Sequence, residues 1–105
     1  MNVRTKHISQ LIRQYISEVE PLSEVILYGS RARGDERKDS DWDILVLLEQ
    51  DDNIQTERKL RNKIYDLEIE TGESFSVFVY SKKNWNTKQR VTPFFRNVSR
   101  EGLIL

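Results

Sequence analysis

The sequence contains no cysteine, two prolines, four glycines and one histidine in 105 residues. Without cysteine the chain can form neither a disulfide framework nor a thiolate zinc site, and it is compatible with a reducing compartment. We find no internal repeat, linker or low-complexity segment. The single histidine, His7, falls on the polar side of an expected helix, and we interpret it as a surface residue.

The sequence also lacks a long apolar run. No stretch approaches the roughly 20 apolar residues needed to span a bilayer. The first ten residues, MNVRTKHISQ, lack the apolar core of a secretory signal. We therefore expect a cytoplasmic protein with no membrane association.

The chain has the composition of a soluble domain, with 37% hydrophobic and 32% charged residues. We expect residues 1–105 to form one domain, because this length supports one core but not two. The net charge is zero, yet residues 1–81 carry 11 basic against 16 acidic residues, and residues 82–105 carry six against one. This basic segment is either a solvated face or a docking surface for an acidic partner or a nucleic acid.

Apolar spacing predicts the secondary structure. Residues 8–19 repeat apolar side chains every three or four positions, which indicates a helix that ends at Pro21. We expect strands at residues 23–29, 42–49 and 74–80, a helix at 54–70, a short helix near Ser81, and a further helical turn after a break at Pro93. The first two strands are too apolar to be exposed edges. This order predicts an α/β (α+β) domain, with a small mixed sheet and helices packed mainly on one face.

A polar loop follows the first strand. Gly29 and Ser30 stand where that strand passes into a helix, and a glycine there lets backbone N–H groups approach a phosphate. Taken alone, a Gly-Ser pair is usually only a turn with a capping serine. Four basic residues make the loop cationic: Arg31, Arg33, Arg37 and Lys38.

Two carboxylates follow the loop. Asp41 and Asp43 are separated by one residue, so in an extended chain they point to the same side. Two oxygen ligands a few ångströms apart suit a divalent cation, with substrate phosphates and water completing its shell. A solvated strand entrance is the alternative, but Asp43 lies in an apolar run, where an unpaired charge is costly.

Together, Gly29-Ser30, Ala32-Arg33-Gly34 and Asp41-Trp42-Asp43 followed by ILVLL resemble the GSxARG…SDxDLxV signature of minimal nucleotidyltransferases, which belong to the polymerase-β-like superfamily. The resemblance implies the nucleotidyltransferase fold and transfer of a nucleoside monophosphate, AMP from ATP or the equivalent from another nucleoside triphosphate, to a hydroxyl on a partner. It further implies that Gly29, Ser30 and Arg33 bind the nucleotide. Asp41 and Asp43 would be catalytic and would bind Mg²⁺ or Mn²⁺.

The resemblance also concerns partners and turnover. Minimal nucleotidyltransferases often pair with a small helical HEPN-type protein, in several cases as the antitoxin of a toxin pair. Catalytic members usually carry a third acidic residue on the next strand, where this sequence has Ser76. Three hypotheses therefore stay open: an active nucleotidyltransferase, a catalytically impaired nucleotide-binding or antitoxin module, and an interaction protein.

Glu73 is the acidic residue nearest to Ser76 that could replace the missing carboxylate, but it would face away in a regular strand. We also expect the isolated domain to self-associate.

Overall fold

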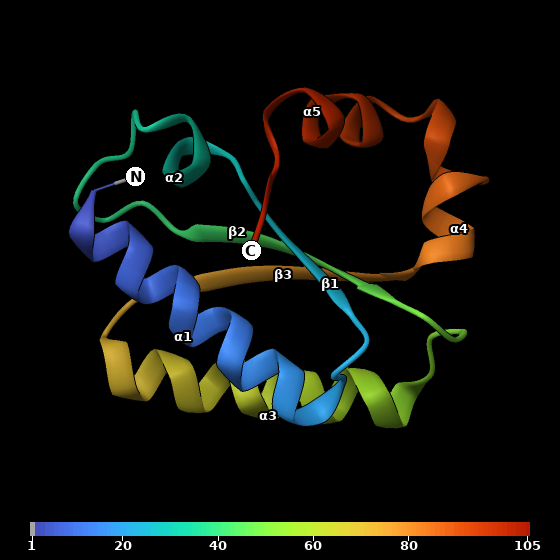
Figure 1. Cartoon of the computed structure of the whole chain (residues 1–105), viewed down its shortest axis with the longest axis horizontal. Coiled ribbons are helices and arrows are strands. Elements are labelled where there is room, and N and C mark those ends of the chain that lie inside the picture. Colours follow the sequence, from blue (N-terminus) through green and yellow to red (C-terminus); the bar gives the residue numbers. More distant parts are fainter. Residues whose placement is uncertain (1) are drawn as a thin grey trace.

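The computed structural model describes residues 2–105, and its centre is a four-stranded sheet in the order β3-β2-β1-β4 (Figure 1). The strands are β1 (Glu24–Tyr28), β2 (Trp42–Leu48), β3 (Phe75–Ser81) and β4 (Leu103–Ile104). Strand β1 is antiparallel to both β2 and β4, whereas β2 and β3 are parallel. The predicted mixed sheet is confirmed, and β1 and β2 are its inner strands, as their apolar sequences predicted.

Residues 2–105 contain six helical segments besides the sheet. They are α1 (Val3–Val19), α2 (Ser30–Arg33), α3 (Ile54–Thr71), α4 (Lys82–Asn86), the 3-10 helix η1 (Gln89–Val91) and α5 (Pro93–Glu101). Both long helices are capped by an asparagine side chain that accepts a backbone hydrogen bond: Asn2 from Thr5 for α1, and Asn53 from Thr56 for α3. The predicted helix at 54–70 is thus confirmed within one residue.

The core has two parts, one on each face of the sheet. The long helices α1 and α3 pack on one face with six buried side chains: Ile8, Ile12, Ile16, Leu60, Ile64 and Leu67. The segment containing α4 and α5 packs on the other face through Trp85 and Val98, which contact Ile26, Leu45 and Leu47. The long helices lie on one face as predicted, and the basic segment covers part of the opposite face.

Strand β4 is an element that the sequence analysis did not predict. The side chain of Leu105 contacts the α1/α3 core. Leu103 and Ile104 instead pair with β1 while their side chains stay 37% and 72% exposed. A two-residue strand with exposed side chains has no alternating pattern, so its sequence carries no strand signal.

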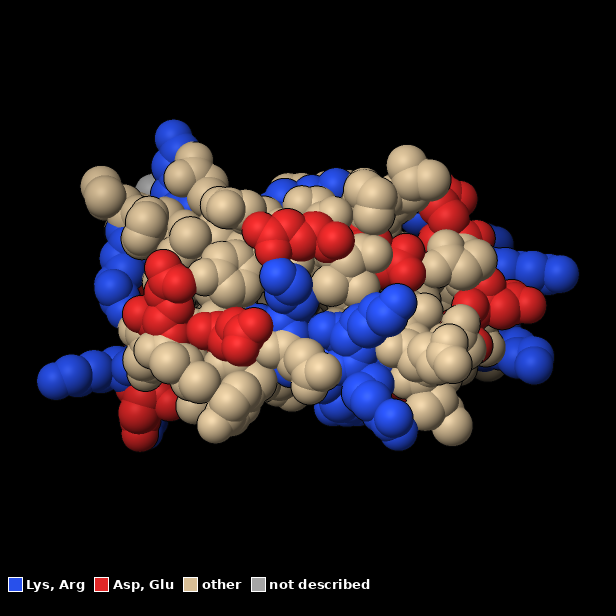
Figure 2. Space-filling view, turned by 90° about the horizontal axis from the view of Figure 1, so that it is seen from below, with Lys and Arg blue, Asp and Glu red and all other residues tan. Residues whose placement is uncertain are grey.

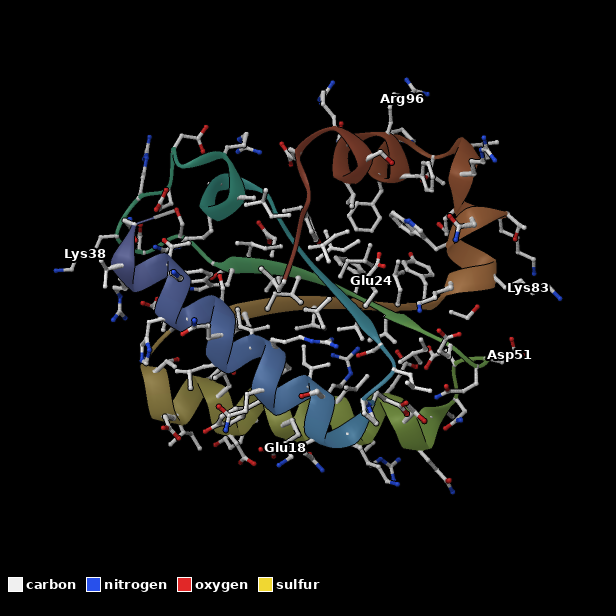
Figure 3. The ribbon with its side chains drawn as sticks, viewed as in Figure 1. Glu18, Glu24, Lys38, Asp51, Lys83 and Arg96 are labelled. Atoms are coloured by element: carbon white, nitrogen blue, oxygen red, sulfur yellow. The ribbon has the colours of Figure 1, made fainter. Side chains whose placement is uncertain are left out.

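Charged side chains lie on the outer side of both helical layers. Seen from below, on the side of α3, acidic and basic side chains are intermixed (Figure 2). On the opposite side, Lys83 of α4 and Arg96 of α5 point away from the sheet (Figure 3). The basic segment therefore keeps its aromatic side chains inward and its charges outward. Within residues 2–105, every helix is too short or too polar to cross a bilayer.

Candidate functional site

The turn after β1 depends on Gly29, which caps the four-residue helix α2. Its backbone has φ 76° and ψ −159°, a conformation that is nearly exclusive to glycine. A Cβ at this position would lie 2.2 Å from Asp43 Oδ2. Glycine is therefore required twice, once by the backbone conformation and once by the adjacent carboxylate.

Asp43 lies on the face of the sheet that α5 covers in part, and it is half-buried, whereas Asp41 precedes β2 and is exposed. Burial raises the pKa of Asp43, and the negative charges of Asp41 and Glu101 raise it further, against the opposing effect of Arg33. The folded protein thus disfavours an ionised Asp43 when no cation is present. A bound cation would relieve this unfavourable electrostatic environment.

Asp43 is the middle of a row of three polar side chains across the sheet. It pairs with Tyr28 of β1 on one side and with Ser76 of β3 on the other. Because paired residues on neighbouring strands point to the same face, Ser76 lies beside Asp43. Burial, followed by the charge of Asp43, raises the pKa of Tyr28 to about 12, so its phenol stays neutral and adds no negative charge.

A third carboxylate reaches this turn from the other end of the chain. Glu101 is the last residue of α5, and its Oε1 accepts a hydrogen bond of 3.1 Å from the backbone N–H of Gly29. Its Oε2 lies 2.9 Å from Arg33 Nη1. The sequence analysis missed this residue, although Glu101 is the only acidic residue of the basic segment. Its position as the single acidic residue among six basic ones was the only sequence feature that could have indicated a special role for Glu101.

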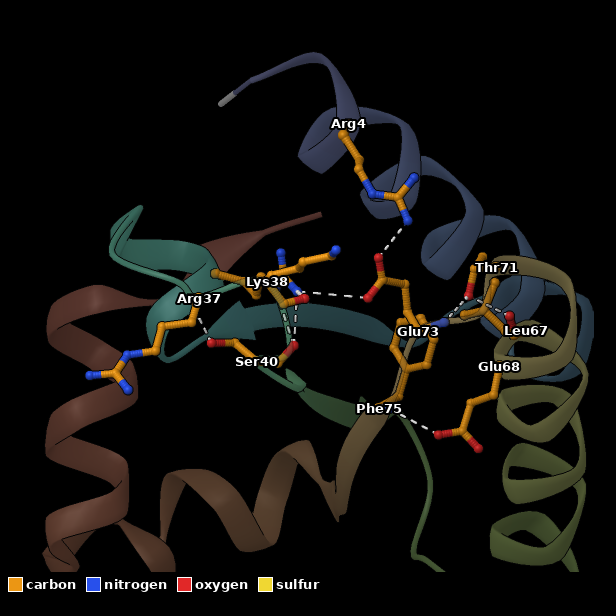
Figure 4. Close-up of polar contacts among 10 residues, drawn as sticks. Arg4, Arg37, Lys38, Ser40, Leu67, Glu68, Thr71, Glu73 and Phe75 are labelled. Atoms are coloured by element: carbon orange, nitrogen blue, oxygen red, sulfur yellow. Dashed lines mark hydrogen bonds and ion pairs between the residues drawn. The ribbon is translucent and has the colours of Figure 1, made fainter.

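Glu73, the alternative acid considered from the sequence, has a different role (Figure 4). It forms ion pairs with Arg4 and with Arg31, the latter at 3.7 Å. Arg31 also donates to the carbonyl of Ser40 at 2.9 Å and lies 4.7 Å from the ring centre of Trp42. These contacts tie the loop between α2 and β2 to the start of α1, on the face of the sheet opposite Asp43. Glu73 therefore holds the loop in place, and it faces away as predicted.

The residues of the turn, the aspartates and the inner strands lie within a match to a known family. Residues 10–93 fit the family model described as Polymerase beta, Nucleotidyltransferase. The chain belongs to this family. The match spans most of the sequence and includes the Gly-Ser turn, both aspartates and β3, so the resemblance carried by the signature is confirmed.

Solved structures share this nucleotidyltransferase fold. A toxin-antitoxin crystallised with AMP-PNP has a TM-score of 0.65 and 16% identity, covering 90% of this chain and 69% of that one. A Sulfolobus solfataricus protein assigned as a nucleotidyltransferase has a TM-score of 0.60 and 23% identity, covering 95% and 80%. At these identities the similarity establishes the fold. No curated protein sequence matches the chain significantly.

The structure brings the five predicted site residues into one neighbourhood. Gly29 contacts Asp43, Asp41 lies close enough to Asp43 to raise its pKa, and Arg33 reaches the same turn through Glu101. Ser30 is the first residue of α2, and its carbonyl accepts from the N–H of Gly34 at 2.9 Å. Ser30 is half-buried and lies directly beside Gly29.

The side chains present fit a magnesium ion that is shared with a nucleotide. Asp41 and Asp43 are hard oxygen donors beside a cationic loop, and one of them has a raised pKa that a cation would lower. Within residues 2–105, no group of three or more His, Cys, Asp or Glu side chains is arranged to hold a metal ion. The two aspartates would therefore bind the metal together with phosphate and water oxygens. Trp42, which separates the two aspartates in the sequence, is fully buried in the core.

Proposed function

We propose that this domain transfers AMP from ATP to a hydroxyl group, with Mg²⁺ held by Asp41 and Asp43. The proposal rests mainly on the close contact between the Gly29 turn and Asp43, one of the two proposed metal ligands. A Cβ at Gly29 would lie 2.2 Å from Asp43 Oδ2. A phosphate at the Gly-Ser turn would then lie next to a cation at Asp43. This adjacency is what a triphosphate bridged by a metal requires.

Each side chain has a distinct role in this proposal. Asp41 and Asp43 would hold Mg²⁺, which, when bound, neutralises charge on the triphosphate and orients it for in-line attack. The backbone N–H groups of the Gly29-Ser30 turn and the guanidinium of Arg33 would hold phosphate oxygens. The ion pairs of Glu73 with Arg4 and Arg31 keep the loop that carries Asp41 in a defined position. Most of the catalytic contribution would come from positioning and charge stabilisation.

Calorimetric titration with ATP, with and without Mg²⁺, tests the proposal. We expect binding to depend on Mg²⁺ in the wild type and to lose that dependence in Asp43→Asn, because the variant lacks one metal ligand. Since the pKa of Asp43 is raised, protonation competes with the metal at a higher pH than for an ordinary aspartate. Binding should therefore begin to weaken, as the pH is lowered, at a higher pH than an ordinary aspartate ligand would give. Binding that is indifferent to both metal and substitution would contradict the metal site.

A catalytically impaired nucleotide-binding module is the second candidate function, and Ser76 favours it. Ser76 is the residue of β3 that pairs with Asp43, so a third carboxylate at this position would lie beside the two proposed metal ligands. We expect Ser76→Asp to raise AMP transfer by about 10² or more, the usual contribution of one well-placed acid or base group. Labelled AMP incorporation from ATP is the measurement. Asn62→Asp, which adds the same charge at an exposed position of α3, is the control and should leave the rate unchanged.

The partner is part of the same proposal. We infer that the domain acts as an antitoxin and that its acceptor is a small helical HEPN-type toxin in the cytoplasm. The fold shared with a toxin-antitoxin crystallised with AMP-PNP supports this inference. The outward-facing basic residues of α4 and α5 supply a surface for an acidic protein, next to the face that carries Asp43.

A further inference from the structure

The carboxylate of Glu101 binds to the Gly29 turn and to Arg33 in the way that an anionic ligand would. One carboxylate oxygen accepts from the backbone N–H of Gly29 at 3.1 Å, and the other pairs with Arg33 at 2.9 Å. The side chain of Glu101 is only 17% exposed, whereas that of Arg33 is 46% exposed. A backbone N–H together with a guanidinium is a donor set that also binds phosphate oxygens.

The chain after α5 holds Glu101 in this place. Strand β4 pairs with β1, and the N–H of Leu105 donates to the carbonyl of Val25 at 2.8 Å. Between α5 and β4, Gly102 packs so closely that a Cβ would lie 2.6 Å from the carbonyl oxygen of Val98 and 2.8 Å from the side chain of Ile26. The end of α5 is therefore fixed against β1, the strand that leads into the Gly29 turn.

Neither the helix nor the aspartate pair explains why a glutamate is here. A negative charge in the last turn of a helix is unfavourable, because the carbonyl end of the helix dipole is itself negative. Glu101 also lies near Asp43 and repels it. Within residues 2–105, its side-chain hydrogen bonds are those with the Gly29 N–H and the Arg33 guanidinium. The Gly29 N–H and the Arg33 guanidinium thus already hold an anionic group in the folded protein.

We propose that Glu101 occupies the phosphate subsite formed by the Gly29 N–H and Arg33, and that a nucleoside triphosphate must displace it to bind. The inference rests on the proposed function, since it takes the Gly29 turn as the place of a nucleotide phosphate. When the phosphate displaces Glu101, Arg33 and the Gly29 N–H donate their hydrogen bonds to the phosphate instead of to the internal carboxylate. The end of α5 thereby lowers the affinity for nucleotide.

Calorimetry with two probes, magnesium AMP-PNP and magnesium tripolyphosphate, tests this competition. We expect Glu101→Ala to bind both probes about tenfold more tightly than the wild type, because no internal anion has to be displaced. Glu101→Gln keeps an acceptor but loses the charge, so its gain should be about threefold. Asp35→Asn is the matched control. It removes the other carboxylate that pairs with Arg33, at 3.1 Å, and leaves Glu101 on the Gly29 N–H. Its affinity should change by less than about twofold.

The outcomes separate this inference from the proposed function. Tighter binding of both probes by Glu101→Ala, but not by Asp35→Asn, supports the competition. Tighter binding of tripolyphosphate by Glu101→Ala without any binding of AMP-PNP supports Glu101 as the occupant of a phosphate subsite, but it overturns displacement by a nucleotide and contradicts the proposed function. Equal or weaker binding by Glu101→Ala overturns the competition, and so does an equal gain in Asp35→Asn, which would reflect net charge alone. Failure of every protein to bind either probe overturns both. Thermal melts of each variant establish that the proteins compared are folded.

Discussion

Asp41→Asn and Asp43→Asn should each reduce the transfer of labelled AMP from ATP by about a thousandfold. Charge stabilisation by a bound metal is worth several kcal/mol in the transition state, and each 1.36 kcal/mol corresponds to a factor of ten in rate. Both substitutions keep the shape of the side chain and remove its charge, so they remove metal binding with little change in packing. The measurement is incorporation of label into a co-expressed partner or into the protein itself.

Melting temperatures distinguish a loss of metal binding from misfolding of the variants. The raised pKa of Asp43 means that its ionised form is disfavoured in the folded protein at neutral pH. Without Mg²⁺, a neutral asparagine at this position should therefore keep or slightly increase the melting temperature while activity is lost. Asp39→Asn, at an exposed position of the same loop, is the control and should retain full activity. Activity within tenfold of the wild type in Asp43→Asn would contradict the assigned role.

Gly29→Ala should be the most destabilising single substitution at the site. The φ of 76° and ψ of −159° cost a residue with a Cβ about 1–3 kcal/mol. The new Cβ would also meet Asp43 Oδ2, so Asp43 would have to move. We expect a loss of about 3 kcal/mol in the free energy of unfolding, or a fall in Tm of about 12–24 °C. Nucleotide binding should be lost as well, because Asp43, one of the two proposed metal ligands, would be displaced.

Gly34→Ala is the matched control for Gly29→Ala. Gly34 also has a positive φ, 85°, but a Cβ there would meet no atom within 4 Å. It should therefore show backbone strain alone, about 1–2 kcal/mol. The difference between the two variants, measured by chemical denaturation, gives the cost of the contact with Asp43. Equal destabilisation of both variants would show that this contact costs nothing.

The main elements were predictable because their signals are local. The helix at 54–70, the two inner strands and the Gly-Ser turn follow from apolar periodicity and turn chemistry within short windows of sequence. The pairing of Asp41 with Asp43 needed only the alternation of an extended chain. Local signals of this kind also placed Ser76 on β3, where the parallel register sets it beside Asp43.

The elements that were missed depend on contacts between distant residues. Strand β4 exists because β1 offers it an unpaired edge, and its own two residues show no strand pattern. The contact of Glu101 with Gly29 joins positions 72 residues apart and requires α5 to end against β1. Glu73 likewise acquired its role only when α1 placed Arg4 next to it.

By itself, the sequence determined the family, the inner strands, and the Gly-Ser turn followed by two aspartates, because each of these lies within one contiguous stretch of about 20 residues. Only the tertiary structure decided which charges meet. It placed the single acid of the basic segment on the backbone N–H of Gly29, and it turned Glu73 towards Arg4 and Arg31 on the opposite face. The physical reason is that an ion pair or hydrogen bond depends on distances of about 3 Å, which packing of the whole chain sets and no local pattern encodes.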